Sequence, residues 1–563
     1  MPHENIYQQL GVFMLYFRSS ARKVLLFTSI LAMPQVSYAE TARGIVFDDR
    51  NANGARDTGE PGLTGVRVSN GRDIVATDAS GRYALEIDQD DIVFVIKPRD
   101  WSTRFNNYHM PQFYYIHKPA GSPDDDFVHA GVEPTGPLPE SIEFPLTHSP
   151  EPLKFTMIVM GDPQPTTQRE VRFYANDVIA ELVDTTAQLG ISLGDIVGDD
   201  LALFDSVNAV QAVVGVPWYN VLGNHDMNLQ SLSDEYADET FERVYGPPNY
   251  AFQYGQVHFL VLDNVEYQGM TVDEKGQPQK GSYRGHLTDC QLEFVANFVA
   301  GVPVDERIVV CTHIPLPEIP TGMGETHRIS DLRRLLEILS NHPYTMSFSA
   351  HTHINEHSFL GPEQGYQHGA GDAEHHHHNV VTGSGSWYRG ELDEAGFPVT
   401  TMADGAPNGY IRATFDGNQY RLRYKAARLP EHYQLVIRAP EVVDHNETSA
   451  SEIVVNVFNG SSKSKVRMRV REQCDWVAMF HSPGQDPFYK KMHQRDAALA
   501  GDDRKPIPEP AQTSHLWRAN LPAGLPPGVH VLDVESTDMF GQIDRGIRLI
   551  EVTFLQEEPH QLP

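Results

Sequence analysis

The chain has 563 residues, of which 40% are hydrophobic and 21% charged, an ordinary globular composition with room for about two to four domains. Its formal net charge is -31 at pH 7, and its Lys and Arg residues form no dense run. This charge repels nucleic acid and argues against general DNA or RNA binding. The three cysteines, Cys290, Cys311 and Cys474, lack the short paired spacings of metal or redox motifs, so no disulfide scaffold is expected.

The N-terminus carries the pattern of an export signal. Basic residues at positions 18, 22 and 23 precede the apolar run 24–33, and Ser37-Tyr38-Ala39 follows as a small-x-small cleavage pattern. A short membrane anchor is the alternative, although the run is far shorter than the ~20 residues of a spanning helix. We expect a signal peptide at residues 1–39, no transmembrane span in the mature chain, and a periplasmic or secreted protein.

Residues 41–150 predict a small β-sandwich of the prealbumin-like kind. Short runs of alternating apolar and polar residues occur at 44–47, 65–68, 81–85 and 92–96, and turn residues separate them.

From about residue 151 to 425, apolar runs alternate with helix-like segments, which predicts a doubly covered α/β sheet. The runs are 155–160, 190–193, 219–222, 257–262, 307–311 and 345–349, and helices are expected at 170–189 and 331–340. Strand-like alternation returns at 451–457 and 529–534. We therefore expect a C-terminal β-rich domain over residues 430–563.

Potential metal ligands follow nearly every central apolar run. In open α/β sheets, ligands bind beyond the carboxyl ends of the strands, so these side chains should meet in one place. Glycines before Asp162, Asp195 and Asn224 let the backbone turn sharply and approach an ion or phosphate closely. The candidate ligands are Asp162, Gln164, Asp195, Asn224, His313, His351 and His353.

This set suits a pair of divalent ions ~3.5–4 Å apart, which need a shared carboxylate together with oxygen and imidazole ligands. Such a pair clamps a phosphoryl group and lowers the pKa of a bound water. Each motif alone is more often a surface loop or a satisfied polar pair. Five of them in this order at strand ends favour a metal centre.

The five motifs resemble the signature blocks of the calcineurin-like metallophosphoesterase family, over roughly residues 153 to 412. They are Asp162-x-Gln164, Gly194-Asp195-x-x-x-Asp199, Gly223-Asn224-His225-Asp226, Thr312-His313 and Ala350-His351-Thr352-His353. The resemblance implies a four-layer αββα core in a catalytic domain over residues 151–425. The layout is also similar to a bacterial multi-domain branch of the family, with one β-domain before the catalytic domain and another after it.

The resemblance also implies a role for each residue. Asp195 would bridge two ions, with Asp162, Gln164 and His353 completing one site and Asn224, His313 and His351 completing the other. His225 would contact the phosphate or protonate the leaving group. Asp226 would hold His225 in orientation, because a carboxylate beside an imidazole fixes its tautomer.

Two positions depart from the family pattern. Most members have His where Gln164 stands, and a neutral oxygen donor binds a soft or borderline ion less strongly than imidazole does. One of the two metals could therefore be held loosely, and Mn, Fe or Mg becomes as plausible as Zn. Ala350 replaces the usual Gly before the last His pair, which we expect to be harmless.

The loops at 383–390 and 404–410 are candidates for the wall of the pocket. Trp387 and Tyr388 would supply stacking or apolar contacts, and Arg389 would contact a phosphate. The alternative is that these loops are turn-rich connectors.

A second candidate metal site lies in the N-terminal domain. Oxygen ligands stand at positions 1, 3, 5, 9 and 12 of a twelve-residue calcium-loop pattern with Gly at position 6. These ligands are Asp49, Asn51, Asn53, Asp57 and Glu60. No helix flanks the loop, so we expect a structural Ca²⁺ that braces a β-domain. The alternative is a turn satisfied by its own backbone.

Three further features carry weaker expectations. His375-His376-His377-His378 predicts a solvated loop, with contact to substrate or a third ion as the alternative. Asp199 and Asp200 are expected to brace the second ligand loop, and Cys311 to be a core residue.

The leading functional hypothesis is hydrolysis of a small phosphate mono- or diester by a hydroxide activated by two metals. An exported nucleotidase or pyrophosphohydrolase is the first alternative, which an adenine-stacking aromatic pair in the pocket would indicate. The second is a non-catalytic protein that binds a cell-surface partner, and Gln164 is the one feature that favours it.

Overall fold

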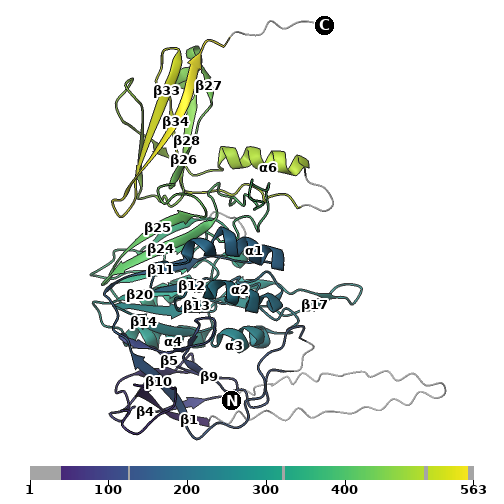
Figure 1. Cartoon of the computed structure of the whole chain (residues 1–563), viewed down its shortest axis with the longest axis vertical. Coiled ribbons are helices and arrows are strands. Elements are labelled where there is room, and N and C mark those ends of the chain that lie inside the picture. Colours follow the sequence, from purple (N-terminus) through teal and green to yellow (C-terminus); the bar gives the residue numbers. More distant parts are fainter. Residues whose placement is uncertain (1–39, 124–126, 320–323, 500–504, 556–563) are drawn as a thin grey trace, which may run out of the picture.

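The computed structural model describes residues 40–123, 127–319, 324–499 and 505–555. The expected signal peptide at 1–39 lies outside these residues. Figure 1 shows three parts along one long axis, with N-terminal strands at one end, an α/β body in the middle and C-terminal strands at the other end. Among the described residues, no helix has the length and apolar character needed to cross a bilayer.

The N-terminal part consists mainly of two four-stranded sheets. In β4 every second residue is buried, which is the alternation that predicts a strand with one face on a core. The first sheet has the order β4 (Arg82–Ile87), β1 (Glu40–Asp48), β10 (Ile142–His148) and β6 (Trp101–Ser102). The second has the order β3 (Ile74–Ala76), β2 (Arg67–Ser69), β5 (Ile92–Val95) and β9 (Tyr114–Ile116).

The central body contains two larger sheets, and all six expected strands are present in them. One has the order β13 (Trp218–Asn220), β12 (Leu189–Ser192), β11 (Lys154–Met160), β24 (Gly409–Asp416) and β25 (Gln419–Ala426). The other has the order β14 (Tyr250–Tyr254), β15 (Val257–Val261), β20 (Arg307–Cys311), β21 (Thr345–Ser349), β23 (His375–Asn379) and β22 (Glu356–Leu360). Strands β11, β12 and β13 run parallel, as do β15, β20, β21 and β23.

Strand β11 packs on both faces. Phe155, Met157 and Val159 belong to one core cluster that also contains residues of β15 and β20. Ile158 and Met160 point the other way and pack with Val171 and Tyr174 of helix α1 (Gln168–Asp177). A parallel bridge between Gly161 and Thr382 links the ends of the two sheets. The carboxyl ends of the parallel strands therefore lie close together.

The helices of the body are short. They are α1, α2 (Phe204–Ala212), α3 (Glu239–Tyr245), α4 (Asp289–Ala300) and α5 (Leu332–Leu339). The helix expected at 170–189 ends at Asp177 and continues only as a 3-10 turn, η1 (Ile179–Leu182). The residues that follow, Val183 to Thr186, are poor helix formers, and Asp184 has a positive φ of 61°.

The histidine run is a buried strand, so the expectation of a solvated loop is wrong. His375 and His377 accept or donate hydrogen bonds at 2.7–2.9 Å with Thr345, Ser347 and Ser349 of the neighbouring β21. Burial lowers the pKa of all four imidazoles. His375 and His377 can be buried inside the sheet because hydroxyl partners satisfy their neutral rings. Cys311, at the end of β20, is buried as expected.

The C-terminal part again has two sheets, together with helix α6 (Pro487–Leu499), which Figure 1 shows between these sheets and the body. One sheet has the order β26 (Leu435–Arg438), β28 (Glu452–Val457), β32 (Leu516–Asn520) and β31 (Phe480–His481). The other has the order β27 (Val442–Asp444), β34 (Ile543–Thr553), β33 (Gly528–Thr537), β29 (Lys465–Val470) and β30 (Val477–Ala478).

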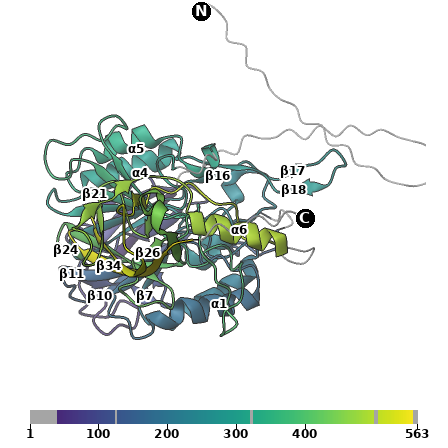
Figure 2. The ribbon, with the colours of Figure 1, turned by 90° about the horizontal axis from the view of Figure 1, so that it is seen from above.

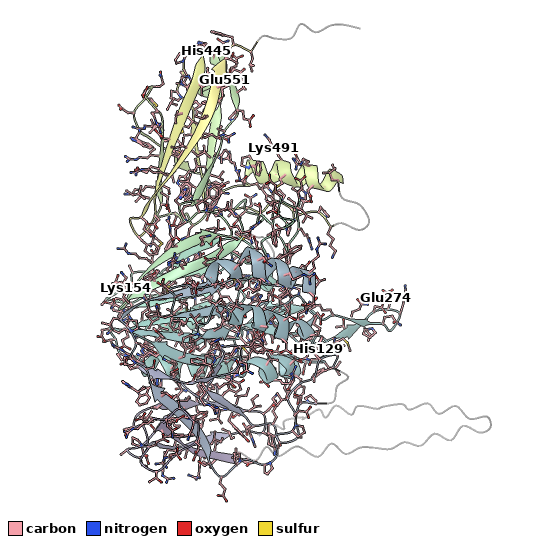
Figure 3. All side chains as sticks on the ribbon, viewed as in Figure 1. His129, Lys154, Glu274, His445, Lys491 and Glu551 are labelled. Carbon is pink, nitrogen blue, oxygen red and sulfur yellow. The ribbon has the colours of Figure 1, made fainter. Side chains whose placement is uncertain are left out.

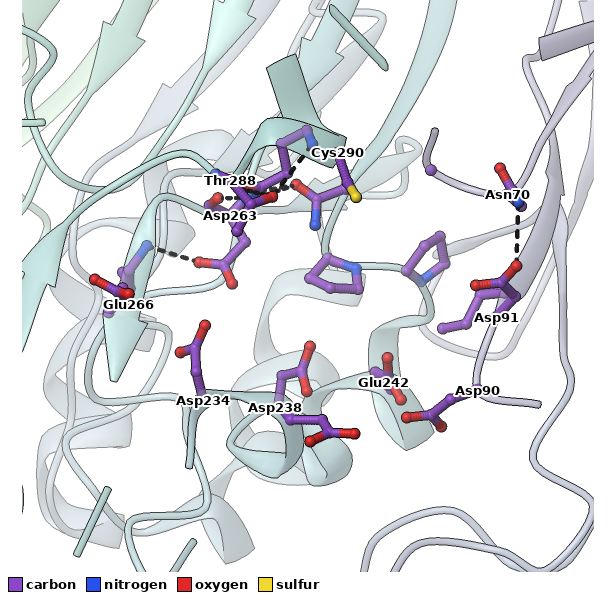
Figure 4. A pocket seen from close by; sticks show the side chains of 18 of the residues that line it. Asn70, Asp90, Asp91, Asp234, Asp238, Glu242, Asp263, Glu266, Thr288 and Cys290 are labelled. Atoms are coloured by element: carbon purple, nitrogen blue, oxygen red, sulfur yellow. Dashed lines mark hydrogen bonds between the residues drawn. The ribbon is translucent and has the colours of Figure 1, made fainter. Parts of the chain in front are cut away.

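A cavity of about 310 Å³ lies between the N-terminal part and the body (Figure 4). Eight carboxylates line it: Asp90, Asp91, Asp234, Glu235, Asp238, Glu242, Asp263 and Glu266. Lys118 bridges the two parts beside it, with its Nζ 2.8 Å from Asp90 and 2.7 Å from both Glu239 and Glu242. One ammonium thus offsets only part of this negative charge.

Candidate metal centre

The candidate ligands follow the carboxyl ends of five parallel strands. Asp162 comes two residues after β11, Asp195 three residues after β12, and Asn224 four residues after β13. His313 and His351 each come two residues after the end of β20 and β21. All seven candidate side chains are buried, and ligand atoms of Asp195, His313 and His351 lie within 4.8 Å of one another. The structure brings the candidate residues together in one buried cluster.

Asp162, Gln164 and His353 form one half of the cluster. His353 donates from Nδ1 to the Gly385 carbonyl at 2.5 Å, which leaves Nε2 facing the cluster. This Nε2 lies 3.0 Å from Gln164 Oε1 and 3.2 Å from Asp162 Oδ2. Asp162 Oδ2 is buried and makes no hydrogen bond to any residue that the structure describes.

Asn224, His313 and His351 form the other half. His313 Nδ1 donates to the Leu193 carbonyl at 2.8 Å, and His351 Nε2 donates to the Thr326 carbonyl at 2.9 Å. The remaining nitrogens, His313 Nε2 and His351 Nδ1, lie 3.1 Å apart. His313 Nε2 is also 3.0 Å from Asn224 Oδ1.

Asp195 lies between the two halves. Its Oδ2 accepts a hydrogen bond from Gln164 Nε2 at 3.2 Å, while its Oδ1 is 3.3 Å from His313 Nε2. The same Oδ1 accepts the backbone N–H of His225 at 2.9 Å. One carboxylate therefore reaches both halves.

The arrangement fits metal ions. Each of the three imidazoles donates one N–H to a backbone carbonyl and turns its other nitrogen toward oxygens or nitrogens that accept. A carbonyl that fixes the tautomer in this way is the usual companion of a metal-ligating histidine. Lone pairs that face one another at about 3 Å need a positive charge between them, which either a proton or a cation can supply.

The pKa values of the carboxyl and imidazole groups also indicate that the cluster favours a positive charge. Burial raises the pKa of Asp162 to about 8, and the Asp195 carboxylate adds to the rise. Burial lowers the pKa of His313, but Asp195 and Asp162 outweigh it and bring the value to about 9. Burial lowers the pKa of His353 to about 4 and that of His351 well below its usual value. The raised pKa values of Asp162 and His313 show that each half of the cluster favours an added positive charge.

The backbone around the cluster is strained and closely packed. A Cβ on Gly194 would lie 2.5 Å from His313 Nδ1, and one on Gly223 would lie 2.1 Å from the backbone nitrogen of Asp195. Only glycine allows these approaches. Non-glycine residues with positive φ gather here: Asp162, Gln164, Asp195, Asp199, His351, His353, Trp387 and Tyr388. Such strain concentrates at functional sites.

The structure pairs His225 with Asp199 instead of Asp226. His225 Nδ1 lies 2.6 Å from Asp199 Oδ1. Asp226 is fully buried and accepts the backbone N–H groups of Ile196, Val197 and Gly223 at 2.9–3.1 Å. Adjacent side chains in the tight turn point in different directions. Asp226, next to His225 in sequence, therefore binds the loop backbone, and Asp199, more distant in sequence, contacts the His225 ring.

The expected pocket wall is only partly exposed to a ligand. Trp387 stacks on His353 with ring centroids 3.9 Å apart, and the Arg389 guanidinium lies 5.3 Å from the centre of the indole ring. Tyr388 is buried, and its hydroxyl donates to the Pro163 carbonyl. Tyr388 therefore supports the Asp162 loop and does not face a substrate, contrary to the expectation.

Sequence reasoning missed two rings on the other side of the cluster. His327 lies with its ring centroid 4.6 Å from that of His351, and Tyr283 meets His351 edge-on at 5.8 Å. Burial lowers the pKa of His327 to about 4, so the ring is neutral. Neither residue belongs to a motif, and no signal in the sequence indicates them.

The expected calcium loop is closed by its own hydrogen bonds. Asp49 accepts the backbone N–H groups of Asn53 and Gly54 at 3.1 and 2.8 Å. Asp57 accepts both amide groups, from Asn51 and Asn53, at 2.8 Å. Glu60 accepts the backbone N–H of Asp57 at 2.8 Å. These bonds are those of a turn satisfied by its own groups, and Ca²⁺ binding stays a prediction.

Three family models match the chain. The model described as calcineurin-like phosphoesterase matches residues 155–355. The models for the N terminal and the C terminal of calcineurin-like phosphoesterase match residues 50–130 and 377–543. No curated protein matches the chain.

Two solved structures show distant likeness. Purple acid phosphatase PPD1 from yellow lupin (Lupinus luteus) seeds has 12% identity and a TM-score of 0.33, over 64% of this chain and 66% of that one, just under two thirds. CopC from Methylosinus trichosporium OB3b has 12% identity and a TM-score of 0.13, over 22% of this chain and 96% of that one. Likenesses at these TM-scores bear on neither fold nor function.

Proposed function

The chain belongs to the calcineurin-like phosphoesterase family, whose members hydrolyse phosphoric esters, and we propose that it does so with two divalent metal ions held between β11, β12, β13, β20 and β21. The observation that carries this proposal is the inward-facing nitrogen on each of His313, His351 and His353, with a backbone carbonyl on the opposite nitrogen. Oxygen and imidazole ligands without thiolate suit Mn, Fe, Zn or Mg.

Seven residues would hold the ions. Asp162, Gln164 and His353 would hold one, Asn224, His313 and His351 the other, and Asp195 both. When bound, the ions supply positive charge that stabilises a phosphoryl group and makes a water molecule more acidic. The four-layer αββα arrangement belongs to this proposal and is supported by the two-faced packing of β11.

His225 would act on the leaving group. Its backbone N–H donates to Asp195 and its Nδ1 pairs with Asp199. Nε2, which bonds to none of the described residues, can then donate to, or accept from, an oxygen of the substrate. An imidazole in this position acts as a general acid that protonates the departing alkoxide. Asp226 would hold the Asp195 and Asn224 loops in place through its three backbone contacts.

The nucleotidase alternative gains no support from the pocket wall. Its signature is a pair of aromatic faces open to a base, but Trp387 is engaged by His353 and Arg389, and Tyr388 is buried. The non-catalytic alternative gains none either, because Gln164 Oε1 occupies a ligand position 3.0 Å from His353 Nε2. We therefore favour a small phosphate mono- or diester as substrate, with Arg389 beside it.

The setting of the enzyme is also a proposal. We infer a periplasmic or secreted protein with a catalytic domain over residues 151–425 and β-domains at 41–150 and 430–563. The sheets of the described residues separate near these positions, which supports the boundaries. A structural Ca²⁺ at Asp49, Asn51, Asn53, Asp57 and Glu60 would brace the first of the β-domains.

Metal analysis combined with a substrate panel tests the function. The purified protein is analysed for transition metals and assayed on phosphomonoesters and phosphodiesters before and after chelation, with Asp195→Asn as the matched variant. We expect about two ions per chain and hydrolysis of at least one substrate class. The Asp195→Asn variant should lose both the bound metal and the hydrolysis. Turnover that survives full removal of metal contradicts the proposal.

A further inference from the structure

An arm projects from the body next to the candidate site. It runs from residue 268 to 281 and carries the short strands β17 (Thr271–Val272) and β18 (Pro278–Gln279). Figures 1 and 2 show it extending away from the body, and Figure 3 places Glu274 at its tip.

The base of this arm is fixed. The Gln268 N–H donates to the Ser282 carbonyl at 2.9 Å, and the Gly281 N–H donates to the Tyr267 hydroxyl at 2.9 Å. Tyr267 is buried and donates in turn to the Leu229 carbonyl at 2.8 Å. The residue before Gly281 is Lys280, so the position of its backbone is held although the tip of the arm is exposed.

Lys280 reaches the residue that holds His225. Its Nζ lies 2.9 Å from Asp199 Oδ1, the same oxygen that lies 2.6 Å from His225 Nδ1. Asp199 has a positive φ of 71°, a strained conformation for a residue other than glycine. The Asp199 side chain is 45% exposed and that of His225 is 28% exposed, so packing alone does not fix either of them.

We propose that Lys280 is a positioning residue of the site, which holds the Asp199 carboxylate against His225 and so fixes the imidazole ring at the mouth of the metal cluster. The inference rests on the function proposed above. An exposed carboxylate with a single partner changes rotamer readily. A second charged donor on the same oxygen restricts the rotamers that the side chain can adopt. The arm thus supplies Lys280 to a row of three interacting side chains, in which Lys280 contacts Asp199 and Asp199 contacts His225.

The geometry distinguishes this role from direct contact with a substrate. Asp199 lies on the Nδ1 side of the ring, and the same Asp199 oxygen that contacts Nδ1 also contacts Lys280 Nζ. The ring nitrogen available to a leaving group is Nε2, on the other side of the imidazole. Lys280 therefore acts through Asp199.

Steady-state kinetics of matched variants test the role. The full chain with Mn²⁺ is assayed on para-nitrophenyl phosphate and on the corresponding diester. Lys280→Met should lower kcat by about two- to five-fold, the size of effect of an exposed ion pair, and leave KM nearly unchanged. Lys280→Arg should restore kcat, and Lys275→Met on the same arm should behave as wild type. An unchanged kcat, or a raised KM at constant kcat, overturns the proposal.

A double-mutant cycle adds a readout that a purely structural role would not move. In an Asp199→Asn background, Lys280→Met should have no further effect on kcat, because Lys280 acts only through the Asp199 carboxylate. Additive losses overturn the proposal.

An NMR measurement on the metal-free protein separates this inference from the function itself. The Nδ1–H resonance of His225, assigned with His225→Gln, should weaken or shift in Lys280→Met and stay unchanged in Lys275→Met. An unchanged resonance in Lys280→Met overturns the contact. If the wild-type protein hydrolyses neither ester, the proposed hydrolase function is contradicted. The His225 resonance still tests whether Lys280 positions His225 through Asp199.

Discussion

His353 Nε2 lies 3.0 Å from Gln164 Oε1, while the other nitrogen of the ring donates to the Gly385 carbonyl. The amide orientation of Gln164 is fixed, because its Nε2 donates to the Asp195 carboxylate. Gln164 thus presents an oxygen to His353, as the proposed metal site requires.

The affinity of this half of the cluster should depend on Gln164. We expect Gln164→Ala to weaken binding of one ion by at least about ten-fold, because a ligand and its bond to Asp195 are both lost. Gln164→His should strengthen binding of Zn²⁺, for which imidazole is the better ligand. Titration calorimetry on the metal-free protein measures both. Equal affinities in all three proteins would mean that residue 164 is not a ligand.

His225 and Asp195 should separate catalysis from metal binding. His225→Ala should keep the metal content and lose about 10²–10⁴-fold in kcat, because only the proton donor is removed. Asp195→Asn should lose metal and turnover together. Metal analysis and kinetics on the same preparations measure this. A fully active His225→Ala protein would rule out the acid role.

Asp226 should matter for stability. Its buried carboxylate accepts three backbone N–H groups, and Asp226→Ala leaves them without a partner. We expect the free energy of unfolding to fall by about 2–4 kcal/mol, the range for buried groups left unsatisfied. Denaturant titration measures the loss, with exposed Asp305→Ala as control. A variant of wild-type stability would show that the loops do not need this brace.

The acidic cavity should make the protein less stable as pH rises (Figure 4). Burial raises the pKa of Asp238 to about 7, and burial also raises the pKa of Asp91, Asp234, Glu242 and Asp263. A carboxyl group whose pKa is raised on folding binds more protons in the folded state, so its contribution is present at low pH and is lost as pH rises through about 7.

Asp238→Asn should therefore stabilise the protein above pH 7, on the order of 1 kcal/mol, and change little near pH 4. Asp238 caps α3 without a side-chain hydrogen bond, so the substitution costs no cap. Melting temperatures across pH for wild type, Asp238→Asn and exposed Glu274→Gln measure the effect. If Asp238→Asn stabilises the protein equally at all pH values, the ionisation of Asp238 is not the cause of the stabilisation.

That the candidate ligands come together could be predicted from the sequence, because the ends of the strands determine where they lie. Asp162, Asp195, Asn224, His313 and His351 each follow an apolar run by two to four residues. Parallel strands bring such positions to the carboxyl end of each of the two sheets, and these ends lie close together. Side-chain direction within the loops could not be predicted. The choice of Asp199 over Asp226 as the partner of His225 depends on positive φ angles that the sequence does not display.

Burial of polar residues was the other limit. His375 to His378 look solvent-exposed in sequence, yet they form the buried strand β23. Hydroxyls of Thr345, Ser347 and Ser349 on β21 satisfy His375 and His377, while His376 meets His357 and Tyr420, and His378 meets Asn355. Trp387 looks like a stacking platform for a ligand, yet it packs on His353. In both cases a partner distant in sequence decides the role.

An anomalous-scattering experiment on crystals soaked in Mn²⁺ tests the central claim most directly. The account predicts two peaks ~3.5–4 Å apart on either side of Asp195, one next to Gln164 and His353 and one next to Asn224 and His351. A single peak, or peaks away from Asp195, would contradict it.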